Sequence, residues 1–498
     1  MNLPSIDVIS SGLSLLFQFD VLLWLGIGTI LGFTVGAIPG FNSTNFLAMA
    51  LPFTIYLRSE QAVIFMMACF CGSQAAGSVP AILLNIPGTP SNPPTCLEGF
   101  PLTRKGKASQ ALGCSIMSST LGGLLSAGLA VVLVPIAGAY ALKFGPPEMF
   151  MVAMFGMTAV GSLTGKSPLK GLFSAILGLF FACVGTEIQR GYVRSSFGFF
   201  ELYEGFPLIP VILGLFGFAE LFSLVQQEWL VEKGRQSFSG YAPIFEGMRE
   251  TLRRWGLVIR SGLIGFIIGV IPGTGAAIAT WVSYGQAKQW SKTPEKFGTG
   301  HYEGLIAADA CNNGVPGGAL MPTLTLGIPG SGTTLIVLAA LLLHGLLPGP
   351  SLFAKYAAEA YAILFSLLIS NGLILVGGLV IVLLMARVTS VPTRFLVPLI
   401  GLFCLAGGFA WRGMVFDMLL VVIFGILGAF LSRYGYSVPA FLLALLLGPL
   451  AEKNFYWSIQ INGFRSFLDP IVFIIFLMTI GMVILPIFRK KMRKRASK

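Results

Sequence analysis

The segment NIPGTPSNPPT, residues 85–95, is polar and breaks helices, although the chain around it is strongly apolar. A similar segment, GIPGSGTT, occurs at 327–334. Proline removes a backbone donor and stops a helix, and the following glycine lets the chain turn and lets a ligand approach the backbone. Non-helical backbone is tolerated at membrane depth only where it is buried in protein or lines a watery cavity. The two segments therefore predict helix breaks that line one ligand site.

The composition is that of a membrane protein. Of 498 residues, 55% are hydrophobic and 10% are charged, with a mean hydropathy of +0.84, whereas soluble domains carry about 25% charged residues. So few charges cannot build the polar surface of a soluble protein of this size. We therefore predict an all-α polytopic membrane protein in a lipid bilayer. Apolar runs that can span it as helices occur at roughly 20–38, 108–141, 147–163, 169–186, 205–226, 255–271, 355–386, 393–411, 414–432, 436–450 and 467–488.

Two motifs occur twice. LGFTVGAIPG at 31–40 aligns with IGFIIGVIPG at 264–273, an offset of 233 residues. GSQAAGSVPAILLNIPGTP at 72–90 aligns with GVPGGALMPTLTLGIPGSG at 314–332, an offset of 242 residues. Self-similarity of this kind indicates an internal repeat. The predicted divisions are an N-terminal repeat 1–226, a cytoplasmic linker 227–254, a C-terminal repeat 255–450, and a segment 451–498 with a C-terminal transmembrane helix and a basic cytoplasmic tail.

Lysine and arginine residues mark the cytoplasmic loops of membrane proteins. Seven of the last ten residues are Lys or Arg, whereas the first basic residue of the chain is Arg58. With the tail inside and the N-terminus outside, the basic clusters at 103–107, 166–170 and 226–256 also lie inside. The first repeat then begins outside and the second inside, which is an inverted repeat, common among secondary transporters. In this assignment Arg190, Arg194 and Arg412 lie outside.

Each repeat carries two Pro-Gly breaks, at 38–45 and 85–95 in the first and at 271–280 and 327–334 in the second. Helices that begin at a break present N–H groups and a positive dipole end, which suits an anion. One such pair alone is more often a simple kink or turn, but four at symmetric positions favour broken helices or re-entrant hairpins around a site. The break residues are Pro39, Gly40, Pro87, Pro272, Gly273, Pro329 and Gly330.

An acidic residue in an otherwise neutral stretch is a candidate for ion coupling. Asp309 lies in GLIAADACNNGVPGG, residues 304–318, and is followed by Asn312 and Asn313. An ionisable residue at membrane depth is a functional candidate by default, here for Na⁺ or H⁺. The alternative is a loop or helix-capping residue near the water interface. Arg104 and Lys105 either contact an anion or belong to the positive cytoplasmic face.

Several other classes of function find no support in the sequence. The cysteines and the two histidines form no metal-binding motif, no catalytic constellation is visible, and no nucleotide-binding motif occurs. We expect neither an enzyme nor a metal site nor an organic cofactor, and no continuous polar pore of a channel. The basic tail directly follows the apolar run 467–488, which favours contact with anionic lipid and not with nucleic acid.

The motifs resemble those of the large membrane subunit of the tripartite tricarboxylate transporters, the TctA family. The resemblance covers nearly the whole chain. It implies a bacterial cell inner membrane protein that imports tricarboxylates or related carboxylates by secondary active transport, a symport driven by a Na⁺ or H⁺ gradient. The implied partners are a small four-helix membrane subunit (TctB-like) and a periplasmic solute-binding protein (TctC-like). The most specific motifs are GxxxGxIPGF at 32–41, GSVPAILLNIPGTP at 77–90, GFPLTRKGKA at 99–108, GVIPGTGAAIA at 269–279 and GIPGSGTT at 327–334.

Carried onto this chain, the motifs imply a set of substrate contacts. We further expect Gly88 and Gly330 to admit the ligand and to take positive φ, and 20–100 with 255–350 to move, elevator-like, against a scaffold drawn mostly from 108–226 and 355–450. The alternative function is a one-component ion-coupled carboxylate carrier or an exporter without a binding protein. The implied contacts are Asn42, Ser43, Thr44, Asn85, Gly88, Thr89, Thr274, Ser331, Gly332 and Thr333.

Overall fold

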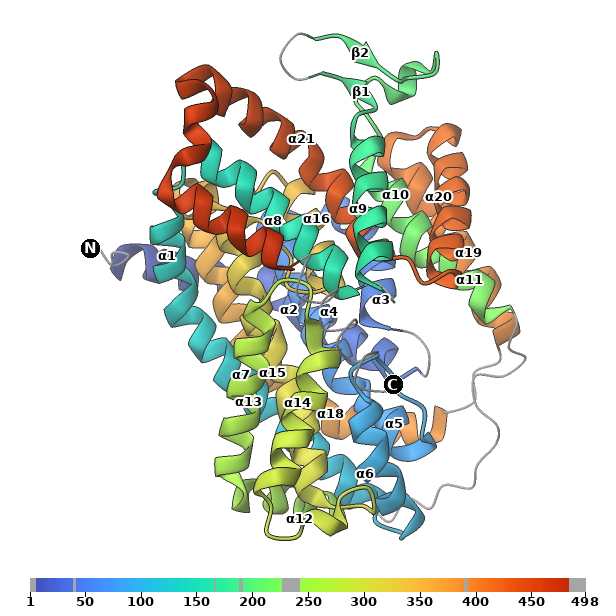
Figure 1. Ribbon diagram of the computed structural model, residues 1–498. Helices are drawn as coiled ribbons and strands as arrows, with labels where there is room; N and C mark the ends of the chain where they lie inside the picture. Colours follow the sequence, from blue (N-terminus) through green and yellow to red (C-terminus); the bar gives the residue numbers. More distant parts are fainter. Residues whose placement is uncertain are drawn as a thin grey trace, which may run out of the picture.

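A computed structural model describes residues 6–38, 42–164, 167–187, 191–225, 242–388 and 393–482. These residues are mostly helical, with one short antiparallel hairpin of β1 (Gly185–Thr186) and β2 (Val193–Arg194) at the top of Figure 1. Six helical segments of the described chain are long and apolar enough to cross a membrane. They confirm the predicted all-α polytopic membrane protein. Their bounds are Phe19–Gly36, Ser59–Leu84, Ala108–Ala141, Ala357–Val380, Val415–Arg433 and Val438–Ile461.

The helices follow one another with short connections. In the first half they are α1 (Ile6–Leu16), α2 (Phe19–Gly36), α3 (Ser43–Ala50), α4 (Ser59–Ala76), α5 (Ser78–Leu84), α6 (Pro93–Arg104), α7 (Ala108–Ala141), α8 (Pro146–Thr164), α9 (Pro168–Ala182), α10 (Leu208–Ile212), and α11 (Ala219–Leu224), with the π-helical turn η3 (Leu213–Phe218) between the last two.

The remaining helices make up the second half. It contains α12 (Ala242–Arg253), α13 (Trp255–Val270), α14 (Gly275–Trp290), α15 (Tyr302–Leu326), α16 (Gly332–Leu343), α17 (Pro350–Lys355), α18 (Ala357–Val388), α19 (Thr393–Arg412), α20 (Val415–Arg433) and α21 (Val438–Asn462).

Glycines allow α2 to pack closely along α4 and α13 along α15. A Cβ atom on Gly32 would lie 2.4 Å from the carbonyl oxygen of Cys69, and a Cβ atom on Gly265 would lie 2.4 Å from that of Cys311. Small residues of this kind let membrane helices approach backbone to backbone. The two contacts are related by the offsets of 233 and 242 residues found in the sequence, so the repeated motifs make equivalent contacts.

The IPG segments at 86–88 and 328–330 also share a backbone geometry. Asn85 (φ 60°) ends α5 and Gly327 (φ 71°) ends α15 in the left-handed conformation. The N–H of Ile86 and that of Ile328 each donate to a carbonyl six residues earlier, at 3.3 and 3.1 Å. This is the bonding pattern of a Schellman motif. Both segments therefore reverse the chain between one helix and the next, α5 to α6 and α15 to α16.

The expectation that Gly88 and Gly330 take a positive φ is wrong. Neither glycine has a positive φ. A Cβ atom on Gly88 would lie 2.6 Å from the Cα of Gly77, and one on Gly330 would lie 2.7 Å from the Cα of Ala319. These glycines are required because each reversed segment packs directly on the helix before it, and not because of the backbone angle.

The segments between the plain apolar runs contain deeply buried helices. An 18-residue stretch within the span Ser59–Leu84 is entirely buried within the protein, and most of α15 is buried as well. Helices that contact other helices and not lipid can carry polar side chains and glycines, provided that these find partners. The polar residues at 41–100 and 274–350 therefore mark the centre of the fold.

The long helices α7 and α18 flank this centre. α7 packs along α15, and α18 packs along α4 and α7. The predicted linker 227–254 contains α12, an ordered helix that packs on α7: a Cβ atom on Gly247 would lie 1.9 Å from the carbonyl oxygen of Gln110. The part of that linker at 227–241 lies outside the described residues.

The helices α8–α11 and α19–α21 form a second group, in the upper part of Figure 1. Two arginines that the sequence places outside have partners here. Arg194 makes a bidentate pair with Glu452, at 2.7 and 2.9 Å, and Arg412 pairs with the fully buried Asp417. Arg190 lies outside the described residues. Because these two charges are neutralised within the protein, they weigh little as markers of membrane sidedness.

The C-terminal boundary differs from the predicted one. α21 continues to Asn462, beyond the predicted end of the second repeat at residue 450. The predicted final helix at 467–488 is seen as Pro470–Met482. The basic tail lies outside the described residues.

Candidate functional site

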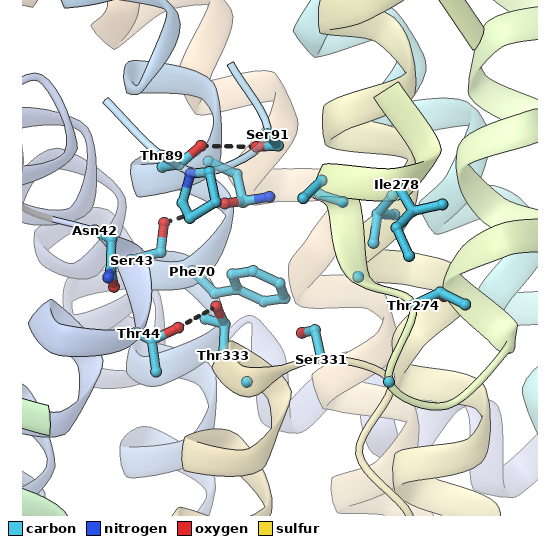
Figure 2. A pocket seen from close by; sticks show the side chains of 18 of the residues that line it. Asn42, Ser43, Thr44, Phe70, Thr89, Ser91, Thr274, Ile278, Ser331 and Thr333 are labelled. Carbon is cyan, nitrogen blue, oxygen red and sulfur yellow. Dashed lines mark hydrogen bonds between the residues drawn. The ribbon is translucent and has the colours of Figure 1, made fainter. Parts of the chain in front are cut away.

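A cavity of about 350 Å³ lies where all four predicted breaks meet. Figure 2 shows Phe70 at its centre, with Thr89 and Ser91 on one side and Thr44, Thr333 and Ser331 on the other. The helices α8 and α15 add Leu163 and Val315. Residues from the breaks that line it are Asn42, Ser43, Thr44, Thr89, Pro90, Ser91, Gly273, Thr274, Gly275, Ala276, Ala277, Ile278, Ser331, Gly332 and Thr333.

Four helices begin at this cavity. The residues that precede their first turns are Asn42 for α3, Asn92 for α6, Thr274 for α14 and Ser331 for α16. The first N–H groups of a helix have no acceptor within it, and the helix dipole is positive at that end. At its first two positions α6 contributes the dipole alone, because Pro93 and Pro94 have no N–H. No Asp, Glu, Lys or Arg is among the described lining residues. The cavity is therefore neutral in side-chain charge but rich in groups that stabilise an anion.

The polar side chains of the cavity are held by local bonds. Asn42 accepts from the N–H of Asn45 at 2.9 Å and caps α3. The Ser331 hydroxyl accepts from the N–H of Thr334 at 3.2 Å and caps α16. The hydroxyls of Thr44 and Thr333, which lie 2.9 Å apart, join the first half to the second across the cavity. The two capping bonds use the N–H groups of Asn45 and Thr334 and fix the lining in place. The two earlier N–H groups of each helix, those of Ser43 and Thr44 in α3 and of Gly332 and Thr333 in α16, are left to a ligand.

The third and fourth breaks are joined through their backbones. The N–H of Gly273 donates to the carbonyl of Gly330 at 3.1 Å, and Gly273 has a positive φ of 78°. The Thr274 hydroxyl donates to the carbonyls of Ile268 and Ile271, at 2.6 and 2.8 Å. A positive φ is available to glycine at little cost, so the Pro-Gly pair at 272–273 allows this close approach.

Some predicted site residues lie elsewhere. Asn85 is exposed at the end of α5, and Gly88 packs on Gly77, whose carbonyl accepts from its N–H at 3.2 Å. Neither lines the cavity, and the same holds for Pro87, Pro272, Pro329 and Gly330. Pro39 and Gly40 lie outside the described residues. The breaks thus shape the cavity, while the residues just after them line it.

Two lining residues on α4 were missed in the sequence. Phe70 and Gln74 lie one helical turn apart and are almost fully buried. Gln74 accepts from the Ser43 hydroxyl at 3.1 Å. Its amide also donates to Asn312 at 3.1 Å, and Asn312 donates back to the Gln74 carbonyl at 3.0 Å. Asn312 therefore touches the wall of the cavity through Gln74 without lining the cavity itself.

Asp309 is fully buried beneath the other wall. Its Oδ1 atom accepts from the hydroxyls of Ser78 at 2.9 Å and Thr95 at 2.6 Å. Ser78 in turn accepts from Asn92 at 3.2 Å, and Asn92 accepts from the cavity residue Thr89 at 2.5 Å. A chain of hydrogen bonds thus runs from Asp309 to the cavity. The interpretation of this residue as a loop or capping residue at the interface is wrong, because it lies within α15 and away from solvent.

Arg104 and Lys105 do not line the cavity. Lys105 donates to the carbonyl of Thr299 at 2.6 Å. Nearby, the fully buried Glu98 accepts from the Tyr284 hydroxyl at 2.7 Å and from the N–H groups of Gly298, Gly300 and His301 at 2.7 to 2.9 Å. Because both carboxylate oxygens are fully used, Glu98 fastens α6 to the connection between α14 and α15.

A second cavity, of about 880 Å³, adjoins the first. Asn42 and Thr44 line both cavities. Its other walls come from η3, α11, α20 and α21, and they include the exposed Arg433 and the half-buried Glu220, which accepts from Asn45 at 2.9 Å. The smaller cavity therefore lies next to a larger polar space at the boundary between the two groups of helices.

A buried polar cavity among broken helices of a polytopic membrane protein defines the class of membrane transport proteins. The comparison with family models specifies the member of that class. The model of the tripartite tricarboxylate transporter TctA family matches residues 22–443, and the chain belongs to this family. The expectation drawn from the motifs is thereby confirmed at the level of the family.

Two relatives come from Agrobacterium vitis. An uncharacterized 52.8 kDa protein from the 3′ region of TAR-I ttuC′ is 35% identical over 452 residues, 90% of this chain and 89% of the relative. An uncharacterized protein from the 3′ region of TAR-II ttuC′ is 34% identical over 190 residues, 38% of this chain and 78% of the relative. No solved structure matches the chain.

Proposed function

We propose that this chain is the large transmembrane subunit of a transporter in a bacterial inner membrane. It imports tricarboxylates or related carboxylates with a small membrane subunit and a periplasmic solute-binding protein, driven by a Na⁺ or H⁺ gradient. The observation that carries the proposal is the convergence of four helix N-termini on a neutral polar cavity.

The chemistry of the cavity suits a small carboxylate. A volume of about 350 Å³ is at the lower end of the range for small-molecule sites. Carboxylates accept hydrogen bonds from N–H groups and hydroxyls, and helix dipoles add favourable electrostatics without a fixed positive charge. A site without Lys or Arg can release its ligand more readily than one that forms ion pairs, and a transporter must release what it binds.

We further propose that the two repeats are inverted and that they support alternating access. The equivalent glycine contacts and IPG reversals of the two halves support the repeat, and the placement of Lys and Arg along the sequence supports its inversion. The mobile unit contains the four breaks, and α7 and α18 move with it because they pack along α15 and α4. The scaffold is then α8–α11 and α19–α21. The cavity that Asn42 and Thr44 share with this boundary is the release vestibule.

The test is uptake of labelled citrate and other carboxylates into liposomes that contain both membrane subunits. Uptake should require the solute-binding protein on the side of entry and an imposed Na⁺ or proton gradient. Uptake by this chain alone would favour the one-component carrier. Absence of uptake for every carboxylate under all gradients, with correctly inserted protein, would contradict the proposal.

A further inference from the structure

Four buried oxygen atoms on α7 and α15 have no hydrogen-bond partner among the described residues: Oδ2 of Asp309, Oδ1 of Asn313, Oγ of Ser119 and Oγ1 of Thr120. Thr120 shares a face of α7 with Gly123, which lies against Asn371 of α18 and not against α15. The other three residues, Asp309, Asn313 and Ser119, are 0%, 3% and 1% exposed. Buried polar atoms are nearly always paired, so unpaired ones indicate a ligand, an ion or a catalytic role. A carboxylate oxygen and an amide oxygen, which can only accept, with a hydroxyl in the same region, favour a ligand with positive charge.

The packing of the two helices brings these residues to one seam. A Cβ atom on Gly122 of α7 would lie 2.1 Å from the carbonyl oxygen of Ala310 of α15. One turn further along both helices, the Ser126 hydroxyl donates to the carbonyl of Gly314 at 2.5 Å. The two helices therefore run parallel here, and residues four positions further along α7 contact residues four positions further along α15.

Helical periodicity then sets the position of each oxygen. Ser119 precedes Gly122 by three residues, so it lies on the face of α7 that contacts α15. Asp309 and Asn313 are four residues apart and share one face of α15. The seam thus carries one carboxylate oxygen, one amide oxygen and one hydroxyl oxygen within about one turn of each helix.

We propose that these three oxygens bind a Na⁺ ion, and this inference rests on the proposed function as an ion-coupled transporter. The site includes Ser119, which the sequence did not indicate, and excludes Asn312, whose amide is bonded to Gln74 in both directions. The single charge of Asp309 balances one monovalent cation, and Asn313 and Ser119 supply neutral oxygen ligands.

Other occupants fit this set of atoms less well. A proton would satisfy one acceptor and leave the others unpaired. Transition metals prefer His and Cys ligands, and no group of three or more His, Cys, Asp or Glu that could hold a metal exists in the described part of the chain. Ca²⁺ takes six to eight oxygen ligands, with carboxylates prominent among them. Oxygen ligands with one negative charge match Na⁺.

The site is connected to the substrate cavity by two routes. On one side Asn312, within the same turn of α15, bonds to the cavity residue Gln74. On the other side Asp309 accepts from Ser78, which accepts from Asn92 next to Thr89. A cation that fixes the position of Asp309 should therefore also stabilise the two sides of the cavity, the one with Gln74 and the one with Thr89. Because such coupling is reciprocal, Na⁺ should raise carboxylate affinity, and carboxylate should raise Na⁺ affinity.

The experiment measures thermal unfolding of the purified full-length chain as NaCl replaces KCl at constant ionic strength, with no carboxylate present. We expect a saturable rise in Tm with Na⁺. The variants Ser119→Ala and Asn313→Leu should raise the half-saturating Na⁺ concentration at least tenfold, and Asp309→Asn should abolish the response. The control is Ser118→Ala, because the Ser118 hydroxyl is equally buried but has partners away from α15, the carbonyl of Cys114 at 2.6 Å and the Thr251 hydroxyl of α12 at 3.4 Å. Its Na⁺ response should equal that of the parent.

Binding of ²²Na⁺ to the same samples provides a second measurement for any variant that unfolds early. Equal Na⁺ responses in Ser119→Ala, Asn313→Leu and the control would overturn the proposal. A Tm that follows pH and not Na⁺ would assign the site to a proton and would overturn it as well.

The failure of this inference and the failure of the proposed function give different results. Carboxylate uptake without any Na⁺ response would remove the cation site and leave the transporter. A Na⁺ response without uptake of any carboxylate would leave the site and contradict the proposed substrate.

Discussion

Gln74 and Asn312 bond to each other twice, once through both side chains at 3.1 Å and once from the Asn312 amide to the Gln74 carbonyl at 3.0 Å. The two residues occupy equivalent central helices, α4 in the first half and α15 in the second. These bonds join Gln74, which lines the cavity, to the turn of α15 that contains Asp309. The pair therefore joins the two halves of the fold directly.

Replacement of this glutamine tests the connection. In Gln74→Leu, Oδ1 of Asn312 loses its donor and the Ser43 hydroxyl loses its acceptor, which costs about 1–3 kcal/mol for each buried group left unpaired. We expect a lower Tm and a higher KM for carboxylate uptake. Gln110→Leu is the control, because Gln110 is partly exposed and does not line the cavity. Unchanged KM in Gln74→Leu would separate this pair from substrate binding.

The hydroxyl pair Thr44 and Thr333 links the two repeats across the cavity. Each Thr→Val substitution removes one hydroxyl at nearly constant shape. We expect both single variants to lower carboxylate affinity, and the double variant to lose less than the combined loss of the two. The coupling energy of contacting residues in such a cycle is typically about 0.5–3 kcal/mol. Strict additivity in binding measurements would mean that the bond does not contribute.

The tight packing of Gly88 and Gly330 predicts a loss of stability on adding a methyl group. Gly88→Ala and Gly330→Ala should each lose about 1–3 kcal/mol through overpacking, measured as a lower Tm in detergent. Gly128→Ala is the matched control, since no atom lies within 4 Å of its would-be Cβ. This control should be neutral or stabilising, because alanine is the better helix former. Equal effects at all three positions would be incompatible with the packing.

Arg433 is the basic side chain at the wall of the larger cavity. An exposed positive charge raises the local concentration of an anion and so speeds its passage, an effect that salt screens. Arg433→Gln should therefore lower the transport rate at low ionic strength and have little effect at high ionic strength. Arg253→Gln, on α12 and paired with Glu250, should behave like the parent. A defect in Arg433→Gln that does not change with salt would point to a structural role.

The inverted arrangement predicts the sidedness of two segments. Single cysteines placed in a cysteine-free background should be labelled from outside near the N-terminus and from inside within 242–254. An odd number of crossings must separate the two segments if the halves are inverted. Labelling of both from the same side would rule the inverted repeat out.

The sequence predicted the residues that line the cavity at the helix breaks, but not the buried residues that lie inside continuous helices. Proline and glycine have local effects on the backbone, so the breaks at 271–280 and 327–334 could be read directly and Thr274 and Ser331 placed beside them. Phe70, Gln74 and Ser119 lie in continuous helices, where nothing local distinguishes a lining residue from a buried one. Their roles depend on which helix packs against which. Gly88 differs from these residues, because the sequence motif marks it. The physical requirement for glycine there is a tertiary contact with Gly77, which the sequence does not reveal.

The bonds of Glu98 also constrain the order in which the protein can be made. Its partner groups at Gly298, Gly300 and His301 follow it by 200 to 203 residues, so a ribosome completes the first repeat long before they exist. A buried carboxylate without donors is strongly unfavourable, and α6 can take its final position only after α14 and α15 have been inserted. The first repeat therefore stays incompletely folded in the membrane until the second repeat has been inserted. Neither half expressed alone should reach its native structure, whereas both halves produced together in one cell should be able to assemble.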